Sequence, residues 1–94
     1  MPHINVFCKR CQCVITLPDL SEEDRMQVVS FVRAGPHARA VQLLHTRGGL
    51  DLLEAKAVEM HITRTPGTCV RCRRQLHGRG ETECESCGSL ALDW

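Results

Sequence analysis

Six of the seven cysteines fall in three Cys-x-x-Cys pairs, and two of these pairs lie close together near the end of the chain. Cys69 and Cys72 are followed, after eleven residues, by Cys84 and Cys87. Each Cys-x-x-Cys turn directs two thiolates at one point, so two facing turns complete a tetrahedron of sulfur ligands. This number and spacing of cysteines predicts a Cys₄ zinc site. Disulfide bonds and a redox-active dithiol are the alternatives, and the spacing favours neither.

The segment between these two pairs indicates how they meet. Gly78 and Gly80 bracket an expected hairpin turn, which would place the pairs at the same end of two short antiparallel strands. Gly88 directly follows the last cysteine, where a metal-binding turn often needs a positive φ. The motif and its setting resemble a zinc ribbon, and we expect residues 66–94 to form one.

The third pair, Cys8 and Cys11, precedes a β-prone run from Cys13 to Leu17. This knuckle and strand resemble half of another ribbon, so we predict Cys8 and Cys11 as ligands of a further metal ion. Cys13 is expected as a buried strand residue. Three arrangements stay open: Cys13 and a histidine complete the site, the pair shares a metal with a C-terminal pair, or both thiols stay free. The candidate histidines are His3, His61 and His77.

The composition makes a metal important for folding. The chain has 94 residues and its aromatic residues are Phe7, Phe31 and Trp94, so the core must be aliphatic. A chain this short buries a modest fraction of its surface, and its last thirty or so residues cannot fold on apolar burial alone. Structural zinc can supply the difference, on the order of 10 kcal/mol.

The cysteine content also bears on location. The N-terminus lacks the apolar stretch of an export signal, and no run approaches the roughly 18 apolar residues of a membrane span. Seven cysteines without an export signal indicate a reducing cytosol, where thiols stay free to bind metal. We therefore expect a cytoplasmic protein with no membrane partner. The formal net charge of +1 is too small to assign a partner.

Three short helices are expected between the cysteine-bearing ends, over residues 19–34, 36–46 and 51–61. Ser21 and Asp51 are expected N-caps, because each can accept a bond from the first turn of its helix. Gly35 and Gly48-Gly49 end the first two helices. The residues expected to face inward at helical spacing are Met26, Val29, Val32, Ala40, Val41, Leu44, Leu50, Leu53, Ala57 and Met60.

Together these elements predict a small α+β metal-binding protein. Residues 1–18 would form an N-terminal knuckle and strand, residues 19–63 a three-helix segment, and residues 66–94 the zinc ribbon. The linker is Thr65-Pro66-Gly67-Thr68.

Part of the helical segment resembles the C-terminal domain of the bacterial ribosomal stalk protein. The matching features are Ala40-Val41, the Gly49-Leu50 turn, Leu52 and Glu54-Ala55-Lys56, within about twenty of the 94 residues. In that family the helical hairpin recruits translation GTPases. The resemblance implies a protein partner in translation, with Glu54 and Lys56 on the binding surface.

Basic residues gather around the first C-terminal cysteine pair. They are Arg71, Arg73, Arg74 and Arg79, with His77 among them. On a strand, Arg71 and Arg73 would share one face while Arg74 points the other way. Guanidinium groups bind two phosphate oxygens at once, so this cluster makes RNA or DNA an alternative partner. The competing expectation is cross-strand neutralisation by glutamates, which are Glu81, Glu83 and Glu85.

We expect no enzymatic activity and no small-molecule substrate. No Cys-x-x-Cys pair has the strand-then-helix context of a thioredoxin, and no nucleophile, phosphate loop or carboxylate cleft is evident. Four cysteine ligands also leave zinc no open position. The leading expectation is a binding module that docks on a macromolecular partner. The alternative is a nucleic-acid-binding regulator that uses the basic ribbon, or the two helices joined at Gly35-Pro36 as a helix-turn-helix.

Overall fold

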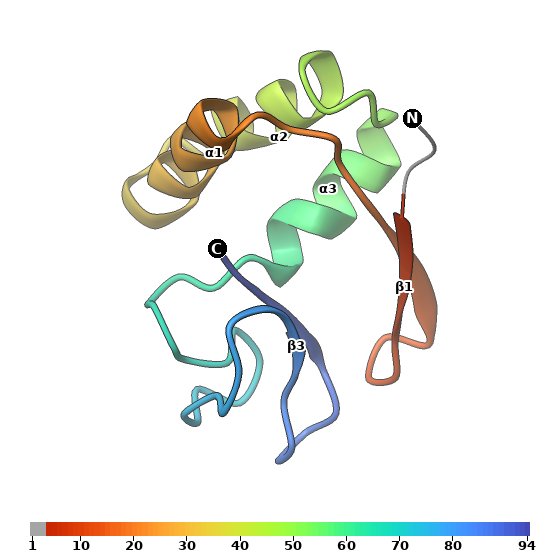
Figure 1. Cartoon of the computed structure of the whole chain (residues 1–94), viewed down its shortest axis with the longest axis vertical. Coiled ribbons are helices and arrows are strands. Elements are labelled where there is room, and N and C mark those ends of the chain that lie inside the picture. Colours follow the sequence, from red (N-terminus) through yellow and green to blue (C-terminus); the bar gives the residue numbers. More distant parts are fainter. Residues whose placement is uncertain (1–3) are drawn as a thin grey trace.

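The computed structural model describes residues 4–94, which form three helices and two separate two-stranded sheets. In chain order the elements are β1 (Ile4–Cys8), β2 (Cys13–Leu17), α1 (Glu22–Ala34), α2 (His37–Thr46), α3 (Leu52–His61), β3 (Gly80–Glu83) and β4 (Leu90–Asp93). Figure 1 shows α1 and α2 at one end of the molecule, with α3 running from them toward the two β-hairpins. The fold class is therefore small α+β, as the sequence predicts.

The two sheets are antiparallel hairpins. In the first, β1 pairs with β2 so that Cys8 lies opposite Cys13. In the second, β3 pairs with β4 from Gly80 opposite Asp93 to Glu83 opposite Leu90. Each hairpin carries a Cys-x-x-Cys pair at its turn, and Figure 1 places both turns at the same end of the molecule.

The expected N-caps Ser21 and Asp51 and the expected stop at Gly35 are confirmed, whereas the first two helices begin later than expected, at Glu22 and His37. The Ser21 hydroxyl accepts a hydrogen bond from the Asp24 backbone N–H at 3.1 Å, which starts α1. Asp51 and Glu54 form a reciprocal capping box at the start of α3, with bonds of 2.7 and 3.0 Å. Gly35 ends α1 with a φ of 76°, which glycine adopts without steric cost. Local sequence therefore sets the helix boundaries.

One cluster of buried side chains joins the N-terminal hairpin, all three helices and β4. Its members are Cys8, Ile15, Leu17, Val28, Val32, Ala40, Leu44, Leu50, Ala55, Val58, Ile62, Leu90 and Leu92. A second, smaller cluster contains Cys69, Leu76, Cys84 and Ala91. The C-terminal hairpin thus contributes to both clusters, through Leu90 and Leu92 to one and through Ala91 to the other.

Three residues expected to face inward are exposed, and for these the sequence prediction is wrong. Met26 is 67% exposed on α1, and Leu53 and Met60 are 80% and 50% exposed on α3. The buried residues of α3 are instead Ala55 and Val58, together with the polar Glu59 and His61. Because α3 carries apolar residues on more than one side, its pattern did not single out the face that packs on the core.

The hairpin expected around Gly78 and Gly80 is also not the one that forms. The chain already reverses within the first C-terminal cysteine turn, so Thr68 and Gln75 on its flanks pair as an isolated antiparallel bridge. Gly80 then begins β3, whose partner is β4. The second cysteine pair consequently lies in the β3–β4 turn.

A polar network attaches α1 to the end of the chain. The Arg33 guanidinium donates to the Thr63 hydroxyl at 2.9 Å and to the Trp94 carbonyl at 3.1 Å. Thr63 in turn donates to the Asp93 carboxylate at 2.9 Å. Asp93 also accepts the backbone N–H of Gly67 at 2.9 Å, so the same carboxylate fixes the start of the cysteine-rich segment.

The longest helix, α1, has 13 residues, whereas crossing a bilayer takes about 20. Across residues 4–94, none of the helices has both the length and the apolar character of a membrane span.

The two leucines near the start of α3 provide a matched test of the core. Leu50→Asp should destabilise the fold by several kcal/mol, because Leu50 is 2% exposed and its replacement buries an unpaired charge. Leu53→Asp should change stability by no more than about 0.5 kcal/mol, as surface substitutions usually do. Urea unfolding of both variants and the parent measures the difference. Equal stability of the two variants would show that the core is placed incorrectly.

Candidate metal centre

All three Cys-x-x-Cys pairs close the same kind of backbone turn. In each, the N–H of the residue after the second cysteine donates to the carbonyl of the first. These bonds are Gln12 to Cys8 at 2.8 Å, Arg73 to Cys69 at 3.0 Å and Gly88 to Cys84 at 2.8 Å. The three donors have φ values of 55°, 63° and 77° respectively. Each turn therefore presents its two sulfur atoms to one side.

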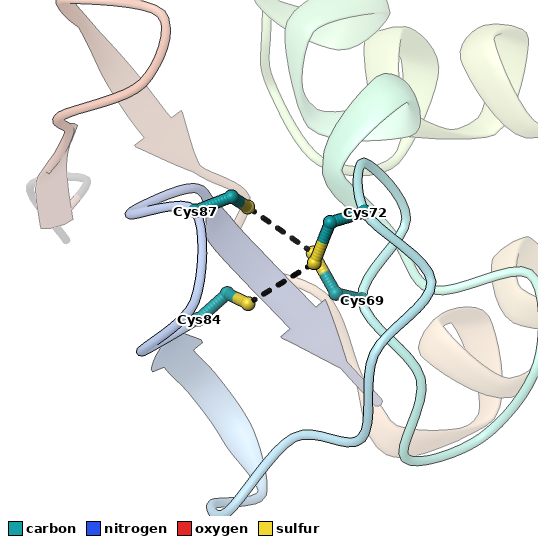
Figure 2. Close-up of side chains that lie close together, drawn as sticks. All are labelled: Cys69, Cys72, Cys84 and Cys87. Carbon is teal, nitrogen blue, oxygen red and sulfur yellow. Dashed lines mark hydrogen bonds between the residues drawn. The ribbon is translucent and has the colours of Figure 1, made fainter.

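Two of these turns face each other and form a cluster of Cys69, Cys72, Cys84 and Cys87, here called the Cys₄ cluster. All four Sγ atoms lie within 4.8 Å of one another. Figure 2 shows the four sulfur atoms pointing toward a common centre, with Sγ–Sγ distances of 3.7 Å for Cys69–Cys87 and 3.6 Å for Cys72–Cys84. Four thiolates about 2.3 Å from a tetrahedral zinc ion would be about 3.8 Å apart, so the cluster fits such an ion.

Short-range bonds hold the two turns in place. The Cys69 backbone N–H donates to the Arg74 backbone carbonyl at 2.9 Å, which closes the first turn. The Cys84 backbone N–H donates to the Ser89 backbone carbonyl at 2.8 Å, which closes the second turn at the end of the β3–β4 hairpin. Leu76 belongs to the same buried cluster as Cys69 and Cys84. The ligand positions are thus fixed by turn geometry with little apolar packing around them.

The thiols of the Cys₄ cluster differ in their affinity for protons. Backbone N–H bonds, first from Cys87 and then from Ser86, lower the pKa of Cys84 to about 6 although burial opposes them. Burial raises the pKa of Cys87 to about 12, and its hydrogen bonds with the neighbouring sulfur atoms act in the same direction. Four such close thiols cannot all ionise together without a cation between them. A divalent metal supplies that charge, so the donor set fits a metal ion in chemistry as well as in distance.

The N-terminal turn lies beside a histidine from α3. Cys8, Cys11 and His61 form a second group, here called the Cys₂His cluster, with ligand atoms within 4.8 Å of one another. Cys11 Sγ and His61 Nε2 are 3.4 Å apart. Among the histidines considered from sequence, the structure brings His61 to this pair; His77 is exposed elsewhere, and His3 lies outside the described residues.

Cys13 does not join either group. Its side chain is exposed, so the prediction of a buried strand residue is wrong. Its cross-strand neighbour Cys8 takes the buried position at this end of the hairpin, where its sulfur accepts the Leu90 backbone N–H at 3.4 Å. The four C-terminal cysteines gather with one another, so Cys8 and Cys11 share no cluster with a C-terminal pair.

The two thiols of the N-terminal turn also differ in pKa. Burial raises the pKa of Cys8, but N–H bonds from Leu90 and Cys11 outweigh it and lower the value to about 6. Burial and the nearby Cys8 sulfur raise the pKa of Cys11, and the positive charge of Arg71 opposes them. The Leu90 N–H is a contributor that the sequence gives no means of identifying, because any residue at that strand position has the same donor.

The arginines predicted as partner-binding residues lie in turns and loops. Arg71, Arg73, Arg74 and Arg79 are all exposed. Residues 71–74 form no strand, so the expected alternation of their side chains is wrong. The Arg71 guanidinium donates to Cys11 Sγ at 2.9 Å. Within the described chain, no salt bridge joins these arginines to the β3 glutamates; Glu83 pairs with Lys9 at 3.4 Å.

The two residues suggested on α3 differ in their surroundings. Glu54 is half-buried and its carboxylate accepts the Asp51 N–H, so it has a structural role in the helix cap. Lys56 is exposed and belongs to the outward face of the helix.

Comparisons of the chain with known protein families, with well-characterised proteins and with solved structures find no match. Functional conclusions for this protein therefore depend on its residues and their geometry.

Removing one sulfur should release the metal of the Cys₄ cluster. We expect Cys84→Ser to hold one metal ion fewer per chain, with loss of dispersed amide signals from residues 66–89, because the segment before β4 has few other buried contacts. Ser86→Ala, in the same turn, is the control and should keep the parent metal content. Elemental analysis together with a two-dimensional amide spectrum measures both. Unchanged metal content and amide signals in Cys84→Ser would contradict the assignment.

Proposed function

We propose that the protein is a non-enzymatic zinc-binding module that docks on a macromolecular partner, with the Cys₄ cluster as its zinc ribbon. The observation that carries this proposal is the group of four converging cysteine sulfur atoms. An all-thiolate tetrahedral set favours zinc, and four protein ligands leave the ion no position for a substrate. All seven cysteines are free, as suits a protein of the reducing cytosol.

The surface that supports a protein partner is the outward face of α3. Leu53, Lys56 and Met60 follow one another at helical spacing, and we call them the α3 stripe. Leu53 is 80% exposed and Met60 is 50% exposed. Large apolar side chains that do not serve the core, next to a lysine, form the kind of surface that one helix offers to a binding groove.

The resemblance of the α2–α3 hairpin to the ribosomal stalk protein supports a partner in translation, and Lys56 of the stripe is among the matching residues. Leu50 is buried at the junction of α2 and α3, where it fixes the hairpin, and the stripe lies on the free side of α3. On this basis the partner is a protein of the translation machinery.

The alternative function is nucleic-acid binding, and a specific observation favours it. Arg73, Arg74 and Arg79 are exposed, and in the described part of the chain none of them forms a salt bridge. Such guanidinium groups are free to contact phosphates. A helix-turn-helix use of α1 and α2 has less support, because His37 near the start of α2 contacts Glu59 at 3.3 Å.

Affinity capture with surface variants separates the two functions. Protein-mediated docking predicts that capture of a partner from cell lysate survives nuclease treatment. It also predicts that Leu53→Asp combined with Lys56→Glu reduces capture at least tenfold, as loss of central interface contacts does. Both positions are exposed, so the folded structure should persist.

The matched control replaces the arginines instead. Arg73→Glu combined with Arg74→Glu should leave capture unchanged if the partner is a protein that binds the α3 stripe. Capture that is abolished by nuclease and by the arginine pair, but not by the α3 pair, would establish nucleic-acid binding in place of the proposed function.

A further inference from the structure

We propose that Cys8, Cys11 and His61 bind a second metal ion of the zinc class, separate from the ion of the Cys₄ cluster. The proposal stands on the N-terminal turn and the end of α3, and does not depend on whether the Cys₄ cluster holds zinc.

The backbone of the N-terminal turn is that of a metal-binding turn. The Gln12 N–H donates to the Cys8 carbonyl, and Gln12 has a φ of 55°, a left-handed conformation that a non-glycine residue adopts at some cost. The Cys11 N–H points at Cys8 Sγ at 3.4 Å. In the first turn of the Cys₄ cluster, the Arg71 N–H points at Cys69 Sγ at the same distance. In both turns a backbone N–H thus points at the first sulfur atom, from three residues further along in the N-terminal turn and from two residues further along in the other.

His61 is oriented as a ligand. Its Nδ1 lies 2.6 Å from the Ala57 carbonyl oxygen, which can only accept, so Nδ1 carries the proton. In the neutral imidazole the lone pair is then on Nε2, the atom directed at Cys11 Sγ. A backbone carbonyl that fixes the far nitrogen of a ligating histidine is the usual outer contact of zinc sites. His61 is 2% exposed, so its orientation is also held by packing.

The distances agree with a shared ion. A sulfur about 2.3 Å and a nitrogen about 2.0 Å from a tetrahedral zinc ion would be about 3.6 Å apart. The Cys11 Sγ–His61 Nε2 distance is 3.4 Å. Cys8 Sγ completes the triangle within 4.8 Å. Three protein ligands are enough to hold zinc in sites whose fourth ligand is water.

Charge explains why this set suits a buried position. Two thiolates and a neutral imidazole cancel the charge of a divalent cation, so the loaded site carries no net charge and costs little to bury. Cys8 is fully buried. Each sulfur atom also accepts a hydrogen bond. The Leu90 N–H donates to Cys8 Sγ, and the Arg71 guanidinium donates to Cys11 Sγ.

The bound ion would connect segments that are distant in sequence. Cys8 and Cys11 belong to the first hairpin, and His61 is the last residue of α3. The Leu90 N–H from β4 contacts the same cluster. The metal would therefore fasten the N-terminal hairpin to the helices and to the C-terminal sheet at one point.

Metal counting on the full chain tests the proposal. The protein is prepared under reducing conditions with excess zinc chloride, freed of unbound zinc, and weighed by native mass spectrometry. We expect two zinc ions per chain. Cys11→Ser and His61→Ala should each hold one, while the exposed Cys13→Ser and His77→Ala, as matched controls, should hold two. Cys84→Ser reports on the Cys₄ cluster alone, so failure of either site is distinguishable from failure of the other.

Alkylation of the unmodified protein gives a second measurement that needs no variant to fold. With zinc bound, iodoacetamide should modify Cys13 and spare Cys11, although Cys11 is only half-buried. Adding a chelator should expose Cys11 to modification. A single zinc per parent chain, with Cys11 alkylated as rapidly as Cys13, would overturn the proposal.

Discussion

The convergence of cysteine sulfur atoms from separate turns is the interaction on which the cysteine-rich end of this protein depends. The buried cluster there contains Cys69, Leu76, Cys84 and Ala91, so half of its members are cysteines. Leu76 and Ala91 alone bury too little apolar surface to offset the entropy of ordering this segment. As thiolates these sulfur atoms repel one another, so a cation among them would favour their convergence. The ligand geometry and the local fold are therefore parts of one equilibrium.

The same reasoning extends to the N-terminal hairpin through Arg71. Its backbone N–H points at Cys69 Sγ in the Cys₄ cluster, while its guanidinium donates to Cys11 Sγ in the Cys₂His cluster. The Lys9–Glu83 pair adds a second link between the hairpins, but both side chains are more than half exposed and such a pair contributes little. Arg71 thus contacts a sulfur atom of each cluster. Its position in the contact between hairpins makes it a poorer candidate for partner binding than Arg73 or Arg74.

The parts of the structure that the sequence predicts are those set by neighbours in the chain. Ser21 and Asp51 cap helices because their side chains reach N–H groups three residues away. The Cys-x-x-Cys spacing likewise fixes each turn. What could not be predicted depends on contacts across the fold. The choice of His61 over other histidines required knowing that the end of α3 meets the first hairpin, and the role of the Leu90 N–H required the position of β4.

The most informative wrong prediction concerns which side of α3 packs on the core. This helix buries some polar side chains and exposes some apolar ones, the reverse of the usual arrangement. Glu59 and His61 are buried, while Leu53 and Met60 are exposed. The cost of burying the Glu59 charge is offset, because its carboxylate accepts a hydrogen bond from the Arg64 guanidinium at 2.9 Å and contacts His37.

A helix that buries polar groups and exposes apolar ones gives up stability that the opposite arrangement would provide, and natural sequences tolerate such conflicts mainly where function requires them. On the inner side, the buried His61 ring places Nε2 beside the Cys11 sulfur, which is the position that the proposed metal ion requires. On the outer side, Leu53 and Met60 contribute little to the fold, whereas a docking surface needs such side chains. The proposed metal site on the inner face of α3 and the proposed partner surface on its outer face would together account for both departures.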